Sequence, residues 1–145
     1  YEHDEYGLTV EDAEKVERMQ RKRARKRNAL MECLDEHRQV NVDGDPEAET
    51  ALVCWGSAKG ACAEAARNLG LRMVQPRVLE PFPAEAFKAA LSGAGTVIDV
   101  EASAAGQFAR LLACQGVAVD EKVLRFDARP FTTDDLEKRL KEVIP

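Results

Sequence analysis

The sequence predicts an α/β domain of three layers, in which a mostly parallel sheet lies between two layers of helices, preceded by a long charged helix. Residues 50–145 alternate between short apolar runs and helical segments at a spacing that suits strands joined by crossover helices. The apolar runs are continuous, which is typical of strands covered on both faces. A chain of 145 residues has room for one domain with one core.

The strands are expected where apolar residues run together between turn signals. Pro76 lies inside the second run and indicates an edge strand or a strand end, because proline cannot donate a ladder hydrogen bond. The expected strands cover residues 51–55, 71–79, 96–100 and 122–126.

Helices are expected between these strands, and each has a signal at one end. Gly70 ends the first as a C-cap, Pro83 begins the second, and Thr132 or Thr133 caps the last, which ends near Val143. The expected helices cover residues 58–69, 83–91, 106–114 and 133–143.

Residues 1–40 are charged and predict a long amphipathic helix. Thr9, followed three residues later by Asp12, predicts its N-terminal cap. The basic run 18–27 interrupts the apolar stripe and marks a point where the helix could break. The composition of residues 41–46 predicts a turn or linker, so the chain divides into 1–45 and 46–145.

The charge distribution argues against nucleic acid and membranes. The net charge is −5, and residues 1–49 hold nine Lys/Arg against fourteen Asp/Glu. The basic run contains no aromatic residue for base stacking, and flanking acids can pair with it, which favours a solvated or interface helix. The chain contains no apolar run of the roughly 18 residues that span a bilayer. The absence of an initiating methionine suggests a piece of a longer chain or a processed one.

The cysteines predict neither a zinc site nor an iron–sulfur site. Cys33, Cys54, Cys62 and Cys114 form no Cys-x-x-Cys pair, and only two histidines accompany them. Cys54, Cys62 and Cys114 are expected to be buried apolar residues. Free thiols fit a reducing cytosol, so a cytoplasmic location is expected. His3, beside two carboxylates, is only a weak metal or proton-relay candidate.

One turn could bind an anion. Ser57, Lys59 and Gly60 follow the first strand at the start of a helix, where free N–H groups favour phosphate or carboxylate. The spacing matches neither a Walker A loop nor Gly-x-Gly-x-x-Gly. A tight turn with Ser57 as N-cap is the favoured interpretation.

Glu101 ends the third strand, where ligands of open α/β sheets bind. It has no neighbouring histidine or second carboxylate for acid–base work, and Ser103 lacks a nucleophile-elbow motif. We therefore expect a polar loop at a subunit interface and no catalytic residue in this chain.

Several stretches occur together in a fixed order. They are 3–7, the basic helix with Lys26-Arg27, 55–60, 77–83, 100–107 and 129–132. In order and spacing they resemble the end of the α subunit of 2-oxoacid:ferredoxin oxidoreductases, especially the 2-oxoglutarate type.

The resemblance implies a structural domain of the transketolase C-terminal type, preceded by the tail of an upstream domain. Such complexes convert a 2-oxoacid and coenzyme A to acyl-CoA and carbon dioxide and reduce ferredoxin. Thiamine diphosphate, Mg²⁺ and an iron–sulfur cluster are expected in the complete complex and none in this chain. The expected partners are a β subunit and a second α subunit, through an interface formed by Glu101, Gln107, Arg129 and Phe131.

The chain departs from the family pattern at two places. Residues 102–105 replace an Asn-Asn-Tyr-like stretch, and Ala128 stands where the family often has glycine. The 2-oxoacid preference or the interface could differ accordingly. The alternative function is a stand-alone flavodoxin-like module that binds an anion or nucleotide at Ser57 and Lys59.

Overall fold

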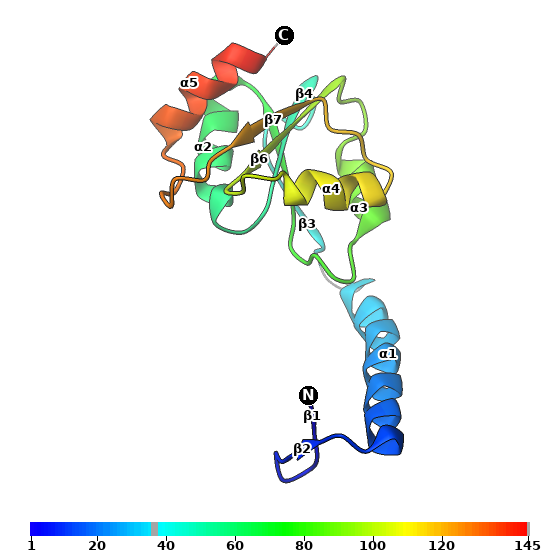
Figure 1. The fold of residues 1–145 in the computed structure, drawn as a ribbon. Coiled ribbons are helices and arrows are strands. Elements are labelled where there is room, and N and C mark those ends of the chain that lie inside the picture. Colours follow the sequence, from blue (N-terminus) through cyan, green and yellow to red (C-terminus); the bar gives the residue numbers. More distant parts are fainter. Residues whose placement is uncertain (36–37, 145) are drawn as a thin grey trace. The chain divides into compact units, whose positions relative to one another are not determined.

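The computed structural model describes residues 1–35 and 38–144, and the chain forms two compact units. Unit 1 is Tyr1–Arg38 and unit 2 is Gln39–Pro145. Unit 2 carries the sheet and most of the helices (Figure 1).

The sheet of unit 2 has five strands in the order β3-β5-β4-β6-β7. β4, β5, β6 and β7 pair in parallel, whereas β3 pairs with β5 in antiparallel orientation at the sheet edge. The prediction of a mostly parallel sheet is confirmed. The strands are β3 Val40–Gly44, β4 Thr50–Cys54, β5 Arg72–Pro76, β6 Thr96–Glu101 and β7 Glu121–Leu124.

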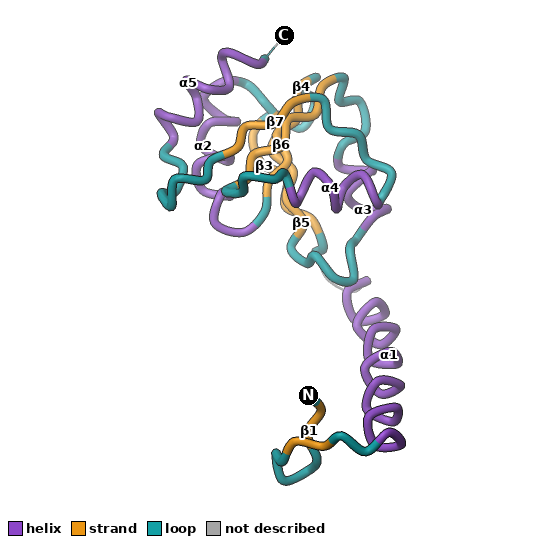
Figure 2. Tube along the Cα trace, viewed as in Figure 1, coloured by secondary structure: helices purple, strands orange, loops and turns teal. Residues whose placement is uncertain are grey.

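Two helices cover each face of the sheet, which confirms the three-layer arrangement (Figure 2). α2 (Lys59–Leu69) and α5 (Thr133–Val143) pack on one face. α3 (Ala84–Ala90) and α4 (Gln107–Cys114) pack on the other.

The central strand β4 shows why the apolar runs are continuous. Leu52 and Cys54 contribute to the core under α2 and α5, while Val53 contributes to the core under α3 and α4. All three side chains are fully buried, since alternate residues of a strand point to opposite faces. Because both faces of β4 are buried, neither of its two alternating sets of positions accommodates a polar side chain.

Helix ends follow the predicted signals closely. Gly70 has φ 65° and ends α2, and the N–H of Leu71 donates to the carbonyl of Ala66 over 2.8 Å. Pro83 is the N-cap of α3. The Thr132 hydroxyl accepts a hydrogen bond from the N–H of Asp135, so Thr132 rather than Thr133 caps α5.

The prediction of a turn at residues 41–46 is wrong for residues 41–44. β3 occupies Val40–Gly44, and the Asn41 amide donates to the Gln75 side chain over 2.9 Å. Val40 and Val42 alternate with polar residues, which is the pattern of an edge strand with one covered face. Asn, Asp and Gly masked that pattern because they are also turn residues.

A buried arginine, Arg72, lies at the start of β5 and connects backbone segments around it. Arg72 is 3% exposed, and its guanidinium donates to the carbonyl oxygens of Ala48, Ala90 and Ser92 over 2.8–3.0 Å. Loop carbonyls thus satisfy most donors of a cation that would otherwise be costly to bury.

Unit 1 contains a two-strand hairpin and one long helix. β1 (Glu2–His3) pairs with β2 (Thr9–Val10), and α1 runs without a break from Ala13 to Asp35. Asp12 caps α1 by accepting a hydrogen bond from the N–H of Lys15 over 2.9 Å. The expected cap at Thr9 is wrong, since Thr9 belongs to β2. Of the helices in the described ranges, none is both long and apolar enough to cross a membrane.

The four thiols differ in exposure, and we expect them to differ in reactivity. Cys54 and Cys62 are buried, and the neighbouring Cys54 together with burial raises the pKa of Cys62. Cys33 and Cys114 are exposed, which corrects the expected burial of Cys114.

Because the thiolate is the reactive form, Ellman's reagent should titrate only Cys33 and Cys114 in the native chain and all four thiols in guanidinium chloride. Fast reaction of more than two native thiols would contradict the packing around Cys54 and Cys62.

Candidate functional site at the carboxyl edge of the sheet

The carboxyl ends of the parallel strands bring four loops to one edge of unit 2. Trp55 follows β4, Arg77 follows β5, Ala102 follows β6 and Arg125 follows β7. This edge is where open α/β sheets bind ligands or partners.

Glu101 anchors the loop that follows β6. The side chain is 1% exposed, and its carboxylate accepts from the N–H of Phe108 over 3.0 and 3.1 Å and from that of Ala109 over 3.4 Å. These amides are free donors of the first turn of α4. The carboxylate thus caps α4 from the end of a strand, and in this chain its oxygens are turned inward.

Gly106 permits the close approach of this turn to β6. It is the N-cap of α4 and has φ 62° and ψ 52°, a conformation that favours glycine. A side-chain carbon at this position would lie 3.5 Å from Cδ of Lys122 and 3.7 Å from Oε1 of Glu101. The stem of Lys122 therefore borders the buried carboxylate.

Asp99 is a second buried acid on the same face of β6, two residues before Glu101. It is 0% exposed, and neither carboxylate oxygen has a hydrogen-bond partner among the described residues. Burial, with a further contribution from Glu101, raises the pKa of Asp99 to about 8. Lys122 opposes this rise. Asp99 is therefore largely protonated at neutral pH.

Of the anion-site candidates, Ser57 lies in a short 3₁₀ turn, Gly56–Ala58 (η1), and Lys59 and Gly60 begin α2. The N-cap of α2 is Ala58, so the prediction of Ser57 as N-cap is wrong. Ser57 lines a cavity of ≈ 80 Å³ together with Trp55 and Ala102. Lys59 and Gly60 are exposed on the first turn of α2, outside the lining of this cavity.

A larger depression of ≈ 370 Å³ also has Trp55 in its lining. Asn41 and Gln75 line it, and the Gln75 amide donates to the carbonyl of Gly56 over 3.5 Å. The turn-like composition of residues 41–46 conceals Asn41 as a residue of this edge. A period-two pattern at 40–43 was the one signal available.

The remaining predicted interface residues lie near the same edge. Gln107 and Arg129 are exposed, and Phe131 is half-buried against the core under α2 and α5. The Arg125 guanidinium lies 6.0 Å from the Phe131 ring centroid, within cation–π range. Two exposed aromatic residues accompany them, Trp55 at 40% and Phe126 at 72%, and neither was among the predicted interface residues.

An ion-pair network holds the loop after β7. Arg125 donates to both oxygens of Asp127 over 2.8 and 3.0 Å and to Asp135 over 2.9 Å. The hydrogen bond from Arg125 lowers the pKa of Asp127 to about 2. Asp127 also accepts from the N–H of Arg129 over 3.2 Å, so the network orients the backbone that carries Arg129.

Within residues 1–35 and 38–144 the structure contains no group of three or more His, Cys, Asp or Glu side chains that could hold a metal ion. His3 instead ends β1, and Asp4 leads into the hairpin turn, where its carboxylate accepts from the N–H groups of Tyr6 and Leu8 over 3.0 and 2.9 Å.

The chain is similar to known α subunits along nearly its whole length. It is 33% identical over 149 residues to the 2-oxoacid:ferredoxin oxidoreductase subunit alpha of Saccharolobus solfataricus and 35% identical over 149 residues to subunit alpha of 2-oxoacid:ferredoxin oxidoreductase 2 of Aeropyrum pernix. Each match covers 99% of this chain, which spans 24% and 23% of the length of those relatives. No protein-family model matches.

The 2-oxoglutarate:ferredoxin oxidoreductase of Magnetococcus marinus shares the fold, with a TM-score of 0.71 and 27% identity. The match covers 97% of this chain and 25% of that one. This chain is homologous to part of a 2-oxoacid:ferredoxin oxidoreductase α subunit. The fold expected from the sequence is thereby confirmed, and so is the expected resemblance to these α subunits.

The unpaired carboxyl of Asp99 should make the stability of this α-subunit segment depend on pH. The folded state keeps a proton that the unfolded state has lost between its ordinary pKa of 3.8 and about 8. The free energy of unfolding should therefore fall as the pH rises through this window, by at least about 1 kcal/mol, the equivalent of one pKa unit. Urea unfolding between pH 4 and 9 measures this slope.

Asp99→Asn should flatten the slope and stabilise the chain above pH 7, because a carboxamide stays neutral. Asp134→Asn, at an exposed position of α5, is the matched control and should leave the slope as it is in the wild type. Equal slopes in the wild type and in Asp99→Asn would rule out Asp99 as the source.

Ala128 should be a point of backbone strain. It has φ 60°, a left-handed conformation that favours glycine, and it occupies the position where the family resemblance suggests glycine. Ala128→Gly should raise the free energy of unfolding by up to about 1 kcal/mol, the strain relieved less the added entropy of the unfolded chain. Ala104→Gly serves as the control, with no positive φ to relieve. A fall in stability for Ala128→Gly would contradict this assignment.

Proposed function

We propose that this chain is a structural and assembly segment of a 2-oxoacid:ferredoxin oxidoreductase α subunit, and that the carboxyl edge of its sheet contacts a partner subunit. The homology over 99% of the chain supports the assignment. The observation that carries the interface is the exposed Trp55, Phe126 and Arg129 at one sheet edge. Aromatic residues and arginine are enriched in interface cores.

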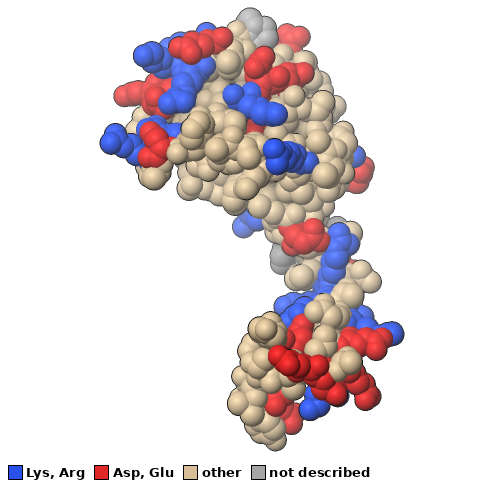
Figure 3. Space-filling model, viewed as in Figure 1, with Lys and Arg blue, Asp and Glu red and all other residues tan. Residues whose placement is uncertain are grey.

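Glu101 has a positioning role in this proposal. Its buried carboxylate fixes the first turn of α4 and so the position of the exposed Gln107. Arg125 and Asp127 similarly fix the backbone at Arg129. Rigid loops lose less conformational freedom on association than mobile ones, which favours stable subunit contacts. Figure 3 shows that many charged side chains of unit 2 gather toward the upper left in this view, with tan surface between them and the lower part of the unit.

The complete complex would decarboxylate a 2-oxoacid oxidatively with coenzyme A, form acyl-CoA and carbon dioxide, and reduce ferredoxin. The Magnetococcus marinus enzyme was solved with 2-oxoglutarate, coenzyme A and succinyl-CoA, which supports 2-oxoglutarate or a similar acid as the substrate. Thiamine diphosphate, Mg²⁺ and the iron–sulfur cluster would belong to the β subunit, the expected partner beside a second α subunit. No catalytic step is assigned to residues of this chain.

Charge reversal at the proposed interface should weaken assembly. We expect Arg129→Glu with Phe126→Ser, in the complete α subunit, to reduce co-elution with the β subunit at least tenfold on size-exclusion chromatography. Lys138→Glu, on the exposed face of α5, is the control and should assemble normally. Normal assembly of the double variant would refute the interface. Failure of the wild-type α and β subunits to associate would refute the function itself.

A further inference from the structure

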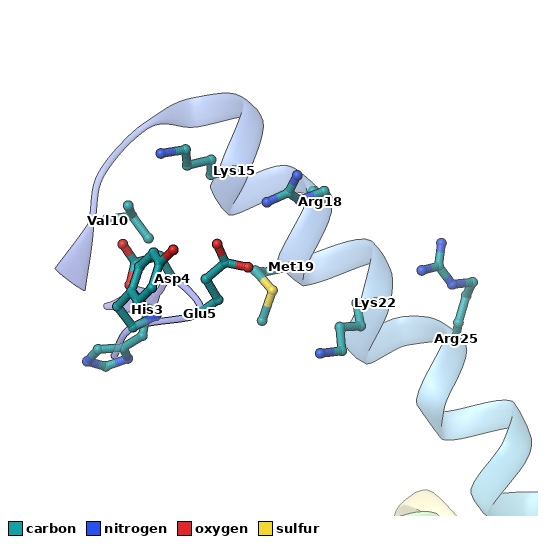
Figure 4. A pocket seen from close by; sticks show the side chains of 10 residues that line it. His3, Asp4, Glu5, Val10, Lys15, Arg18, Met19, Lys22 and Arg25 are labelled. Atoms are coloured by element: carbon teal, nitrogen blue, oxygen red, sulfur yellow. Dashed lines mark hydrogen bonds between the residues drawn. The ribbon is translucent and has the colours of Figure 1, made fainter. Parts of the chain in front are cut away.

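Unit 1 carries a cationic face that the proposed function leaves unexplained. A cavity of ≈ 670 Å³ lies between the hairpin and α1 (Figure 4). Lys15, Arg18, Lys22 and Arg25 line its helical side. Their spacing of i, i+3, i+7 and i+10 places them along one side of the helix. We call these four residues the cationic stripe.

The side chains of the cationic stripe have no partner among the described residues. Elsewhere on α1, Arg21 pairs with Glu17, and Arg23 forms a two-oxygen ion pair with Glu2. Within the described part of the chain, no hydrogen bond or ion pair of the four stripe side chains is found. Like charges at i, i+3 and i+4 destabilise a helix. An anionic occupant would relieve that repulsion.

The hairpin is held in place independently of the cationic stripe. Glu2 is 6% exposed, and its carboxylate accepts from Gln20 over 2.8 Å as well as from Arg23. This buried anchor joins the hairpin to α1 without using any side chain of the stripe. The hairpin contributes His3, Asp4, Glu5 and Tyr6 to the lining, and Tyr6 is 80% exposed.

We propose that the cationic stripe and Tyr6 bind an acidic segment of a protein partner. The stripe extends over about 15 Å, from the helical rise of ten residues, which suits an elongated anionic segment better than a single phosphate. An exposed tyrosine beside arginines has the composition of a protein interface. Asp4 and Glu5 would lie beside the bound segment and limit how many acidic groups it can place there.

Other occupants fit less well. If α1 paired with α1 of a second copy, in either orientation, the basic segment 18–27 would lie against itself. A nucleic acid would be repelled by the net charge of −5 and would find no aromatic residues interleaved along the stripe. A protein segment with a few acidic side chains would neutralise the four basic residues, without the repulsion between two basic helices and without the high charge of a nucleic acid. The proposal does not depend on the oxidoreductase assignment.

A labelled acidic peptide tests this directly. The probe is a fluorescein-labelled helical peptide with glutamates at i, i+3, i+7 and i+10 and one leucine to contact Tyr6, titrated with the full chain and followed by anisotropy. We expect saturable binding that weakens with salt. Arg18→Gln, Lys22→Gln and Arg25→Gln together should weaken it at least tenfold, while keeping the helix, since glutamine is a good helix former.

Arg110, Lys138 and Lys141 are exposed on unit 2, and their joint change to glutamine removes the same charge. This control should change the affinity less than twofold. Equal losses in the two variants, or no binding to the wild type, would overturn the proposal. Tighter binding of an oligothymidine of equal charge would also overturn it, in favour of nucleic acid.

A charge-reversed variant distinguishes the loss of a specific contact from the loss of the fold. Arg18→Glu, Lys22→Glu and Arg25→Glu together should bind a matching lysine peptide and reject the glutamate peptide. Circular dichroism checks that α1 is retained in each variant. A helical variant that gains no affinity for the lysine peptide would contradict the proposed contact.

Discussion

The carboxyl edge of unit 2 depends on one hydrogen-bonded contact, between the Glu101 carboxylate and the first turn of α4. A strand end and a helix start are thereby fixed to each other without a long connecting loop. The amide donors of Phe108 and Ala109 would otherwise be buried without partners. The left-handed backbone of Gly106 allows this approach, so a glycine and a buried acid act together to place Gln107 on the surface.

Burial raises the pKa of the neighbouring acid, Asp99, and the same carboxylate adds to that rise. Two ionised acids on one face of β6 would repel each other in a poorly solvated environment. Glu101 has amide donors to stabilise its charge, whereas Asp99 has none among the described residues. The proton therefore belongs on Asp99. Lys122, whose stem borders Gly106, acts against this from the adjacent strand and lowers the pKa of Asp99.

Local sequence signals predict much of the fold, whereas the predictions fail where contacts between distant residues determine the structure. Gly70, Pro83 and Thr132 act within one helical turn, and the sequence placed them correctly. Local signals do not predict β3, because its pairing with β5, 28 to 36 positions further along the chain, overrides the turn propensity of Asn41 and Gly44. Glu101 was recognised as important, but its cap on α4 depends on a chain reversal that composition does not reveal. The exposure of Trp55 and Phe126 could not be predicted, since their apolar character favours burial.

The antiparallel direction of β3 also has a mechanical consequence. Its first residue, Val40, pairs with Pro76, the last residue of β5, so the chain enters the sheet beside the loops of the carboxyl edge. Tension applied through the preceding residues would load the Val40 end first and peel β3 from β5 one hydrogen bond at a time. Such a strand yields at lower force than one sheared along its length. A pull on the preceding segment would therefore loosen the Asn41–Gln75 contact before it disturbed β4.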